Sequence, residues 1–510
     1  MNYTIVGAGT AGWLTALYVK KQYPDAEVNV IASSEIGILG AGEGTTPLFI
    51  EFLKDIDIPI SGIIKHAKGT IKNSIKFTNW NGDGKHYYHI FRDALTKYEN
   101  DVANKNFDFR PYYLEKISEG DCFNDIQLTP IISELNQVKF DKNTLESYGE
   151  YALHFDANLL AQYLQTVGLE RGIKLVDDEV IKINTDSDGY ISSLNLKSGN
   201  TSTTDFVFDC SGFKRLIIGN FYKSKWISYK NHLPVNRAMP FFVQNDSKDV
   251  PPYTESIAMK YGWMWKIPVQ GRYGCGYVFD SSFATDDEIK KEIEDYVGHE
   301  INVPRVFSFE PGCYDEVCIK NCISIGLSSG FVEPLEATSI WIQVLMLNLW
   351  SKHKDVLNLR NKEAQNIFNS YTKCINKSVL NFIHLHYLSK RTDSKFWTTF
   401  SIKNKSLPLI DNFSELIKTI IPQQSDMDYL TEIETIEMGL QPITYKCIFG
   451  KDSWLQIAAG IKYFDMNVAE KILNTDYPNF INEKSDIKEL FLHISQNLFD
   501  HNNYLENLKK

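Results

Sequence analysis

The sequence lacks the features of several specialised protein classes. Its 510 residues contain no block of basic side chains and the formal net charge is −11, so the chain is a poor candidate for nucleic-acid binding. No apolar run approaches the roughly 20 residues of a membrane-spanning helix. The eight cysteines are scattered without the spacing of a metal knuckle or a redox dithiol. We therefore expect reduced thiols, no bound metal, and a cytoplasmic protein that binds neither nucleic acid nor membrane.

Internal repeats and long low-complexity linkers are also absent from the sequence. A repeat architecture is therefore excluded. A length of 510 residues is enough for a large core and about three domains. Aromatic residues are frequent, at 13% of the chain, which suits a protein with aromatic-lined cavities.

The first residues have the pattern of a βαβ unit. A buried strand is expected at residues 2–6, a helix at 13–23 and a second strand at 28–31. Between the first strand and the helix lies the turn Gly7-Ala8-Gly9-Thr10-Ala11-Gly12. In a G-x-G-x-x-G turn the first glycine allows the tight turn, the second lets the backbone approach a pyrophosphate, and the third lets the helix pack on the strand. This order of elements predicts a dinucleotide site at the helix start.

The second strand lacks the acid that usually holds a ribose in such sites. Ala32 occupies that position, so Ser33, Ser34 or Glu35 is expected to take this role. The next glycine-rich segment is expected to approach the dinucleotide, with a surface turn as the alternative; it reads Gly40-Ala41-Gly42-Glu43. A buried strand at 206–209 leads to Ser211, and such an ending commonly meets a dinucleotide at the carboxyl edge of a parallel sheet.

A second combination of strand, loop and helix surrounds Glu336. An apolar strand at 322–327 leads into a loop rich in Gly and Ser, and an apolar helix begins at about residue 340. Backbone N–H groups at the start of such a helix bind anions well. Glu333 and Glu336 flank Pro334 in the same loop, where they would repel an anion unless each has a separate task. The loop is therefore either a catalytic site or a simple capping box.

Four lysines precede Trp80, namely Lys65, Lys68, Lys72 and Lys76. The last three are four residues apart, so on a helix they would form one charged stripe. A solvated helix face is therefore the simplest interpretation of any one of them.

Two aromatic segments are candidates for a substrate site. Segment 86–91 is either a plain strand or the lining of a flat aromatic site that includes His89 and Phe91. In segment 263–267, Trp263 and Trp265 are two residues apart and therefore lie on the same face of a strand. These two indoles are either core residues or part of the site.

The remaining pattern predicts a mixture of strands and helices. We expect an amphipathic helix at 152–167 and strands of a meander at 174–184 and 191–196. An antiparallel sheet is expected from residues 238–243, 256–259, 263–267 and 274–279. From residue 340 to the end the pattern predicts mostly helices.

Together these motifs resemble those of the flavin-dependent halogenases of the tryptophan-halogenase type. The resemblance covers residues 2 to about 397. The matching segments are the glycine turn followed by Trp13, K-x-x-x-x-F-x-N-W from Lys72 to Trp80, D-C-S-G-F at 209–213, W-M-W-K-I-P at 263–268, F-V-E-P-L-E at 331–336 and R-T-D at 391–393. The lysine and W-x-W-x-I-P matches are specific, whereas many flavoproteins share the glycine turn.

The resemblance implies an α/β fold. An FAD-binding, glutathione-reductase-like Rossmann-type domain would be interleaved with an antiparallel substrate-side sheet and followed by a helical C-terminal region. Residues 1–340 would form the FAD module, with inserts at about 80–150 and 225–310, and residues 341–510 would complete the substrate cavity. The residues expected to bind FAD are Gly7, Gly9, Thr10, Ala11, Gly12, Ser33, Glu35, Gly40, Ala41, Gly42, Glu43, Ser211, Gly326 and Leu335.

The resemblance also implies a reaction. Reduced FAD, dioxygen and a halide would give hypohalous acid, which moves through an internal tunnel to an aromatic substrate. Lys72 falls on the family's catalytic lysine and would hold the acid by a hydrogen bond or as a haloamine. Glu336 falls on the catalytic glutamate and would polarise the oxidant or accept the ring proton. Trp263 and Trp265 would form a barrier that keeps the substrate from the flavin.

Some positions depart from the family pattern. Thr338 and Ser339 fall on the halide-binding turn, which is often Thr-Gly, and Ala337 replaces a residue that is often Ser. Segment 445–454 does not match the stretch rich in Tyr, Phe, Glu and Asn with which tryptophan-specific members grip the amino acid. We therefore expect a substrate other than free tryptophan. We also expect bromide or iodide to be preferred over chloride, because larger halides oxidise and shed water more easily.

Two alternatives to a halogenase remain open. A flavin monooxygenase or oxidase on the same fold would need neither Lys72 nor Glu336, and a non-catalytic flavin-binding protein would need no chemistry at all. Only one dinucleotide turn is present and no separate nicotinamide site, so a partner flavin reductase is expected to supply FADH2, by contact or by diffusion. The sequence leaves open the substrate, the halide and whether the chain forms a homo-oligomer.

Overall fold

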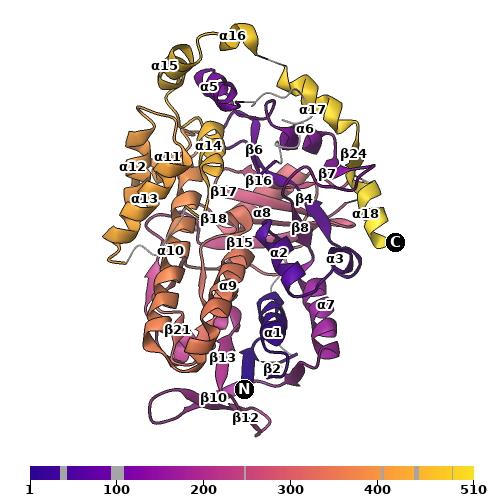
Figure 1. The fold of residues 1–510 in the computed structure, drawn as a ribbon, viewed down its shortest axis with the longest axis vertical. Coiled ribbons are helices and arrows are strands. Elements are labelled where there is room, and N and C mark those ends of the chain that lie inside the picture. The colour runs from indigo at the N-terminus through magenta and orange to yellow at the C-terminus, as the bar shows by residue number, and fades with distance from the viewer. Residues whose placement is uncertain (35–42, 94–107, 246–248, 404–406, 441–446, 485) are drawn as a thin grey trace. The chain divides into compact units, whose positions relative to one another are not determined.

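The computed structural model describes residues 1–34, 43–93, 108–245, 249–403, 407–440, 447–484 and 486–510 (Figure 1). These residues form two compact units, each assembled from three stretches of the chain. Unit 1 comprises Met1–Gly69, Phe155–Lys230 and Glu310–Lys377, and unit 2 comprises Thr70–His154, Asn231–Phe309 and Ser378–Lys510. The division into 1–340 and 341–510 that the sequence suggests stays a prediction.

A six-stranded sheet forms the centre of unit 1. Its order is β21 (Cys318–Ile319), β22 (Cys322–Ser324), β13 (Phe206–Asp209), β1 (Asn2–Val6), β2 (Glu27–Ala32) and β9 (Lys174–Asp177). All neighbours are parallel except β21 and β22, which form a short antiparallel pair. The inner strands are apolar and buried, as strands of a sheet covered on both faces must be. The predicted α/β fold class is confirmed.

Helices cover this sheet. Helix α1 (Thr10–Gln22) follows β1, and α7 (Ala157–Glu170) lies beside it (Figure 1). Every side chain from Trp13 to Val19 is buried, as expected for a helix enclosed by other elements. The other helices that contribute to unit 1 are α2 (Leu48–Asp55), α3 (Ile60–His66), α9 (Thr338–Asn358) and the first part of α10 (Lys362–His386).

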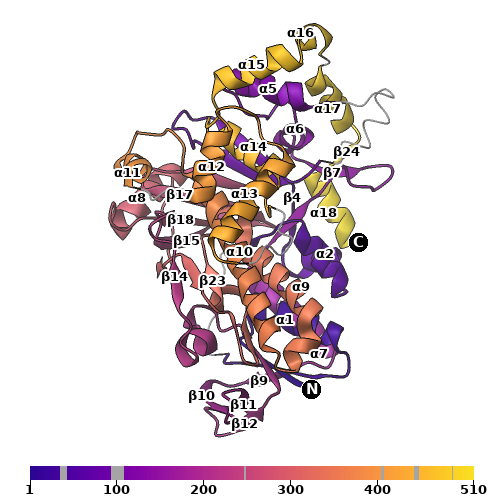
Figure 2. The same ribbon diagram turned by 60° about the vertical axis from the view of Figure 1, so that its left-hand side comes forward.

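Smaller elements complete unit 1. Strands β10 (Val180–Thr185), β11 (Ile191–Leu196) and β12 (Thr201–Thr203) form an antiparallel sheet that stands apart from the helices of this unit (Figure 2). A second small sheet contains β14 (Trp226–Ser228), β20 (Gly312–Tyr314) and β23 (Gly330–Phe331). The short elements are β3 (Glu43–Gly44), η1 (Gly212–Lys214), the π-helical η2 (Leu216–Phe221), η3 (Gly326–Ser328) and η4 (Leu335–Ala337).

A seven-stranded sheet forms the centre of unit 2. Its order is β19 (Phe307–Ser308), β15 (Arg237–Gln244), β18 (Arg272–Phe279), β17 (Gly262–Val269), β16 (Tyr253–Ala258), β5 (Ser74–Thr78) and β6 (His86–Ile90). The pairs are antiparallel as predicted, except that β5 runs parallel to β16. Helix α8 (Asp286–Val297) packs Ile289 and Ile293 against Phe241 and Tyr277 of this sheet, which gives the unit its core.

Two further strand pairs and most of the remaining helices belong to unit 2. Strand β4 (Thr70–Lys72) pairs with β8 (Ala152–Phe155), and β7 (Gln137–Asp141) pairs with β24 (Leu498–Asp500). The helices are α5 (Arg110–Ser118), α6 (Leu128–Glu134), α11 (Lys395–Lys403), α12 (Pro408–Leu416), α13 (Gln424–Glu437), α14 (Lys451–Gly460), α15 (Met466–Asp476), α16 (Phe480–Glu483), α17 (Ile487–Ser495) and α18 (His501–Lys509). The C-terminal region is therefore helical, as predicted.

Three predicted elements are wrong in detail. The helix predicted from residue 152 begins only at Ala157, because Asp156 caps it by accepting the backbone N–H groups of Asn158 and Leu159, and the residues before it form β8. Residues 174–177 join the parallel sheet as β9 and are not part of the meander. The lysine stripe is not on one helix, because Lys72 lies in β4 and Lys76 in β5.

Candidate cofactor site and active site

The carboxyl ends of the parallel strands meet at one edge of the unit 1 sheet. Val6 of β1 is in register with both Ile31 of β2 and Asp209 of β13, and Asp209 is in register with Ser324 of β22. The segments that follow these strands contain the predicted FAD-binding positions Gly7 to Gly12, Ser33, Ser211 and Gly326. Ligands of open α/β sheets bind at this edge, so the sheet brings these segments to one place.

In the turn between β1 and α1, glycine is present for a different physical reason at each of its three positions. Gly7 has a φ of 117°, and a Cβ there would lie 2.3 Å from the carbonyl oxygen of Cys210. A Cβ on Gly12 would lie 1.9 Å from the carbonyl oxygen of Gly7. A Cβ on Gly9 would meet no described atom within 4 Å. Gly7 and Gly12 are therefore required by packing, whereas Gly9 leaves open space in front of the helix.

The start of α1 fits the phosphates of FAD. Gly9 is the N-cap and provides no side-chain cap, and the first turn contains no acidic residue. The hydroxyl oxygen of Thr10 is buried and has no hydrogen-bond partner within the described part of the chain. Helix starts with unsatisfied N–H groups bind anions well. A pyrophosphate would satisfy both the N–H groups and the Thr10 hydroxyl.

An acid does stand beside the end of β2, but a neighbouring strand supplies it. Ala32 is in register with Asp177 of β9, and the Asp177 carboxylate accepts the backbone N–H of Ser34 at 2.7 Å. Ser33 follows directly after β2 and is half-buried. Sequence reasoning missed Asp177 because β9 follows β2 only after more than 140 residues. Glu35, Gly40, Ala41 and Gly42 lie outside the described residues.

Glu43 is the described end of the glycine-rich loop. Burial, together with the negative charge of Asp156, raises the pKa of the Glu43 carboxyl to about 7. A carboxyl group with such a pKa is partly protonated at neutral pH and can donate a hydrogen bond. Its predicted contact with FAD stays a prediction.

Asp209 anchors the turn after β13. It is fully buried, and its carboxylate accepts the backbone N–H groups of Ser211, Ile217 and Ile218. The Ser211 hydroxyl donates to the same carboxylate and accepts the N–H of Leu216. The Ser211 side chain is therefore engaged within the turn, which leaves the surrounding backbone as the part that could meet FAD.

Two other predicted FAD positions lie after β22. Gly326 has a φ of 74°, and a Cβ there would lie 2.9 Å from the Cβ of Ala11, so η3 approaches the start of α1 closely. Leu335 is fully buried. Close packing of η3 on α1 requires glycine at position 326.

The loop that contains Glu336 has an unusual backbone. Glu336 and Ala337 are consecutive residues in the left-handed region, with φ values of 66° and 53°. Each such residue costs about 1–2 kcal/mol relative to the right-handed region. The side chain of Glu336 is 5% exposed and that of Glu333 is fully buried. Strain of this kind persists only where the surroundings impose it, and it is concentrated at functional sites.

The capping-box interpretation of this loop is wrong. Helix α9 begins at Thr338, and its N-cap is Ala337, which makes no side-chain capping hydrogen bond. Thr338 is buried and Ser339 is half-buried. The predicted halide positions therefore form the first turn of a helix without a side-chain cap, where N–H groups favour an anion.

Lys72 is buried in unit 2. Its side chain is 0% exposed, whereas Lys65 and Lys68 are exposed, so a solvated stripe is excluded for Lys72. The ammonium nitrogen lies 5.4 Å from the centre of the Phe91 ring, which is within the range of a cation–π contact. The structure thus brings together one predicted catalytic residue and one predicted substrate-cavity residue.

The other predicted cavity residue, His89, contacts the C-terminal helices. Its Nε2 lies 2.9 Å from the hydroxyl of Ser453, and its ring lies 5.4 Å from that of Phe382. All residues of β6 after His86 are buried, so both faces of this strand are covered.

Sequence reasoning missed Lys139, a second buried lysine beside Phe91. Its ammonium group donates to the carbonyl oxygens of Phe91 and Glu150 and forms a 2.9 Å ion pair with the buried carboxylate of Asp93. All three N–H groups therefore have partners, which is how a buried charge is tolerated. Lys139 therefore fixes the backbone at Phe91 through its hydrogen bond to the Phe91 carbonyl oxygen.

Trp263 and Trp265 are held by different neighbours. The Trp263 indole is 1% exposed, and its N–H donates to the Tyr387 hydroxyl at 3.0 Å. The Trp265 indole lies flat on Gly276, where a Cβ would come within 2.0 Å of the ring. The two ring centres are 6.2 Å apart. The pair is therefore rigid, which suits either a core or a fixed barrier.

The other family motifs pack together in unit 2. Trp80 contacts the rings of Tyr387 and Trp397. Arg391 donates to both carboxylate oxygens of Asp393 and to the backbone carbonyl of Asn79. The N-W and R-T-D segments therefore hold each other in place.

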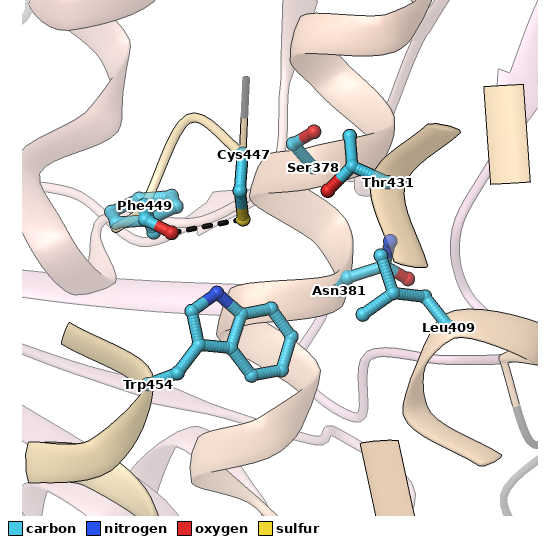
Figure 3. Close-up of a pocket in the computed structure, with 7 residues that line it drawn as sticks. All are labelled: Ser378, Asn381, Leu409, Thr431, Cys447, Phe449 and Trp454. Atoms are coloured by element: carbon cyan, nitrogen blue, oxygen red, sulfur yellow. Dashed lines mark hydrogen bonds between the residues drawn. The ribbon is translucent and has the colours of Figure 1, made fainter. Parts of the chain in front are cut away.

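The C-terminal segment that departs from the tryptophan-specific pattern lines a tight pocket (Figure 3). The Phe449 ring stacks on that of Phe382 with centres 3.8 Å apart. Burial raises the pKa of the Cys447 thiol to about 11, so the thiol is neutral. None of the seven lining residues carries a charge; they are Ser378, Asn381, Leu409, Thr431, Cys447, Phe449 and Trp454. Residues 445 and 446 lie outside the described part.

Two buried histidines flank the Lys72 strand. Thr70 donates its hydroxyl proton to the carbonyl oxygen of Pro268, so it accepts one from Nδ1 of His154 at 3.0 Å. The other nitrogen of His154 then accepts the hydroxyl of Thr254 at 2.9 Å. Burial is the main reason that the pKa of His154 falls well below its ordinary value, and the charge of Lys72 adds to the effect. Burial also lowers the pKa of His501 to about 4.

The low pKa values of these two histidines predict that the free energy of unfolding falls in mild acid. A histidine whose pKa is lower in the folded protein binds its proton only in the unfolded chain between about pH 6.5 and the folded pKa. Above about pH 6.5 neither histidine affects the free energy of unfolding. As the pH falls from there toward the folded pKa, each histidine lowers the free energy of unfolding by about 1.4 kcal/mol per pH unit. Chemical unfolding at pH 7, 6 and 5 should show this loss, with a shallower slope for His501→Gln than for the wild type. Equal slopes would contradict the assignment.

No described helix combines the length and apolar character of a segment that crosses a bilayer. Within the described ranges, no group of three or more His, Cys, Asp or Glu side chains is arranged to hold a metal ion. A parallel sheet with a glycine turn and an uncapped helix start at its carboxyl edge instead defines an α/β protein that binds a dinucleotide cofactor.

Comparison with known proteins narrows this class. A family model described as tryptophan halogenase matches residues 2–474. The tryptophan 7-halogenase RebH of Lentzea aerocolonigenes is 33% identical over 446 residues, which cover 81% of this chain and 80% of that protein. The tryptophan 6-halogenase SttH of Streptomyces toxytricini is 30% identical, over 87% of this chain and 88% of that protein. The solved structure of BrvH, a flavin-dependent halogenase from Brevundimonas sp. BAL3, has a TM-score of 0.81 at 25% identity and covers 100% of this chain and 99% of its own.

The chain belongs to the tryptophan halogenase family. It is a flavin-dependent halogenase, an enzyme that uses FADH2 and a halide. The predicted family, fold class and cofactors are confirmed.

Proposed function

We propose that this enzyme halogenates an electron-rich aromatic substrate other than free tryptophan, with hypohalous acid as the oxidant and Lys72 as the residue that activates it. The observation that carries the proposal is the buried ammonium group of Lys72 beside the Phe91 ring. Lysine side chains are almost never fully buried unless their charge is paired, and Lys72 is 0% exposed.

When bound, FADH2 would give two electrons to dioxygen, and the resulting peroxide-level oxygen would oxidise the halide to hypohalous acid. The chain has one glycine turn of the dinucleotide type, so a separate flavin reductase delivers FADH2. The glycine turn and Thr10 would hold the pyrophosphate, as argued from the open space at Gly9 and the buried Thr10 hydroxyl. Thr338 and Ser339 would hold the halide at the start of α9.

Lys72 makes the halogen more electrophilic. An ammonium group donates hydrogen bonds and accepts none. Donation to the oxygen of hypohalous acid draws electrons from the halogen, which the aromatic ring then attacks. The oxygen leaves as water after it takes the proton that Lys72 offers. The ring carbon gains the halogen and must lose its own proton.

Glu336 accepts that ring proton. It is 5% exposed and lies in a strained loop, as residues of functional sites often do, and a carboxylate is a suitable general base. Trp263 and Trp265 would keep the substrate from the flavin, since their rings are fixed by Tyr387 and Gly276. A hydroxylase would need neither Lys72 nor Glu336, which is why we favour halogenation.

The substrate preference should separate this enzyme from halogenases of free tryptophan. A zwitterion cannot enter an apolar cavity without partners for its charges, and segment 445–454 lacks the stretch with which tryptophan-specific members grip the amino acid. We expect indoles and phenols without a free amino acid group to be halogenated, and bromide to outcompete chloride at equal concentration. Mass spectra of products from both substrate groups measure this. Efficient chlorination of tryptophan would contradict both expectations.

A further inference from the structure

The strand that carries Lys72 is too short to hold itself in place. β4 contains three residues, and its pairing with β8 places Lys72 opposite Ala152. β4 lies at the edge of its sheet, so only its few ladder hydrogen bonds to β8 hold it there. The position of Lys72 therefore depends on the groups that hold Ile71 and Asn73 on either side of it.

His501 holds Ile71 from the last helix of the chain. It is the first residue of α18 and is 0% exposed. The backbone N–H of Ile71 donates to Nε2 of His501 at 3.0 Å, and Nδ1 of His501 lies 2.7 Å from the carbonyl oxygen of Val250. An N–H can only donate and a carbonyl can only accept. His501 must therefore be neutral, with its proton on Nδ1.

The same C-terminal segment also supports Asn73. Strand β24, which ends next to His501, pairs with β7 and places Asp500 opposite Gln137. The carbonyl oxygen of Gln137 accepts the side-chain amide of Asn73 at 2.9 Å, and the backbone N–H of Asn73 donates to Pro252. Both neighbours of Lys72 are thus tied to residues 498–501, one directly and one through β7.

We propose that His501 is a positioning residue for Lys72, and that the C-terminal segment 498–510 completes the active site of this enzyme by supporting the strand that carries Lys72. This inference rests on the proposed role of Lys72. A backbone N–H that loses its acceptor inside a protein seeks another one, so removal of the imidazole would shift the strand that carries the ammonium group. Displacements of about 1 Å can lower a rate on the order of 10²-fold.

The experiment compares three variants of the full-length enzyme. His501→Ala removes the acceptor. His501→Gln keeps an oxygen that can accept from Ile71 and an N–H that can donate to Val250. His493→Ala changes an exposed histidine of the neighbouring helix α17 and serves as the matched control. Steady-state kinetics with reduced FAD, bromide and an aromatic substrate give kcat and KM, and flavin titration gives FAD affinity.

We expect kcat of His501→Ala to fall at least about tenfold while KM and FAD affinity stay within about twofold. His501→Gln should recover most of kcat, and His493→Ala should match the wild type. A wild-type kcat in His501→Ala would overturn the inference, as would equal losses of kcat, FAD affinity and folded protein in both His501 variants, because those losses would indicate a merely structural role. Absence of halogenated product from the wild type would instead overturn the proposed function, and this inference with it.

Discussion

Replacement of Lys72 by methionine is expected to abolish halogenation while FAD still binds. Methionine fills a similar space but donates no hydrogen bond, so the variant isolates the ammonium group. Removal of one donor from a preorganised site typically costs about 10²–10³-fold in kcat. Because Lys72 lies in unit 2 and the glycine turn in unit 1, the flavin titration should be unchanged.

The matched control is Lys65→Met, which alters an exposed lysine of the same part of the sequence. Product is quantified by mass spectrometry in the presence of reduced FAD and bromide. If Lys72→Met retained more than about a tenth of the wild-type rate, the ammonium group would have no direct part in the reaction. If both variants lost activity equally, the loss would not be specific to Lys72.

Glu336→Gln should lower kcat by about 10²- to 10⁴-fold, the usual cost of losing a general acid or base. Glutamine has nearly the same shape and meets the same backbone penalty at a φ of 66°, so the loop should keep its conformation. The measurement is kcat together with the free energy of unfolding.

Two outcomes would separate chemistry from structure at this position. A loss of kcat below about tenfold would show that Glu336 is not the base. A large fall in the free energy of unfolding alongside the loss of kcat would mean that the carboxylate mainly holds the strained loop. Ala337→Gly serves as a backbone control, because glycine relieves the left-handed strain next to Glu336 without touching the carboxylate.

Local sequence patterns predicted the first elements of unit 1 well. Strand, glycine turn and helix follow one another within the first 22 residues, and each is encoded by its own residues. The turn needs Gly7 and Gly12 for packing, and both requirements are visible in the motif. The sequence could not show that Asp177 stands beside Ala32, because strand pairing across so many residues leaves no local signal.

The active-site side was less accessible to such reasoning. Spacing alone assigned Lys72 to a solvated helix, and only the resemblance to a family singled it out. The buried residues that hold its strand and the neighbouring Phe91 were missed because they come from distant parts of the chain; these are His154, His501 and Lys139. The capping interpretation failed because residue types alone do not reveal that Glu336 and Ala337 adopt positive φ.

The most direct test of the proposed reaction is a set of product mass spectra from the wild-type enzyme. Indole and phenol substrates are incubated with reduced FAD, dioxygen and either chloride, bromide or iodide. The account predicts products in which one hydrogen is replaced by the halogen supplied, with the mass and isotope pattern changing from halide to halide. A product that gains one oxygen atom whichever halide is present would contradict it and identify the enzyme as a hydroxylase.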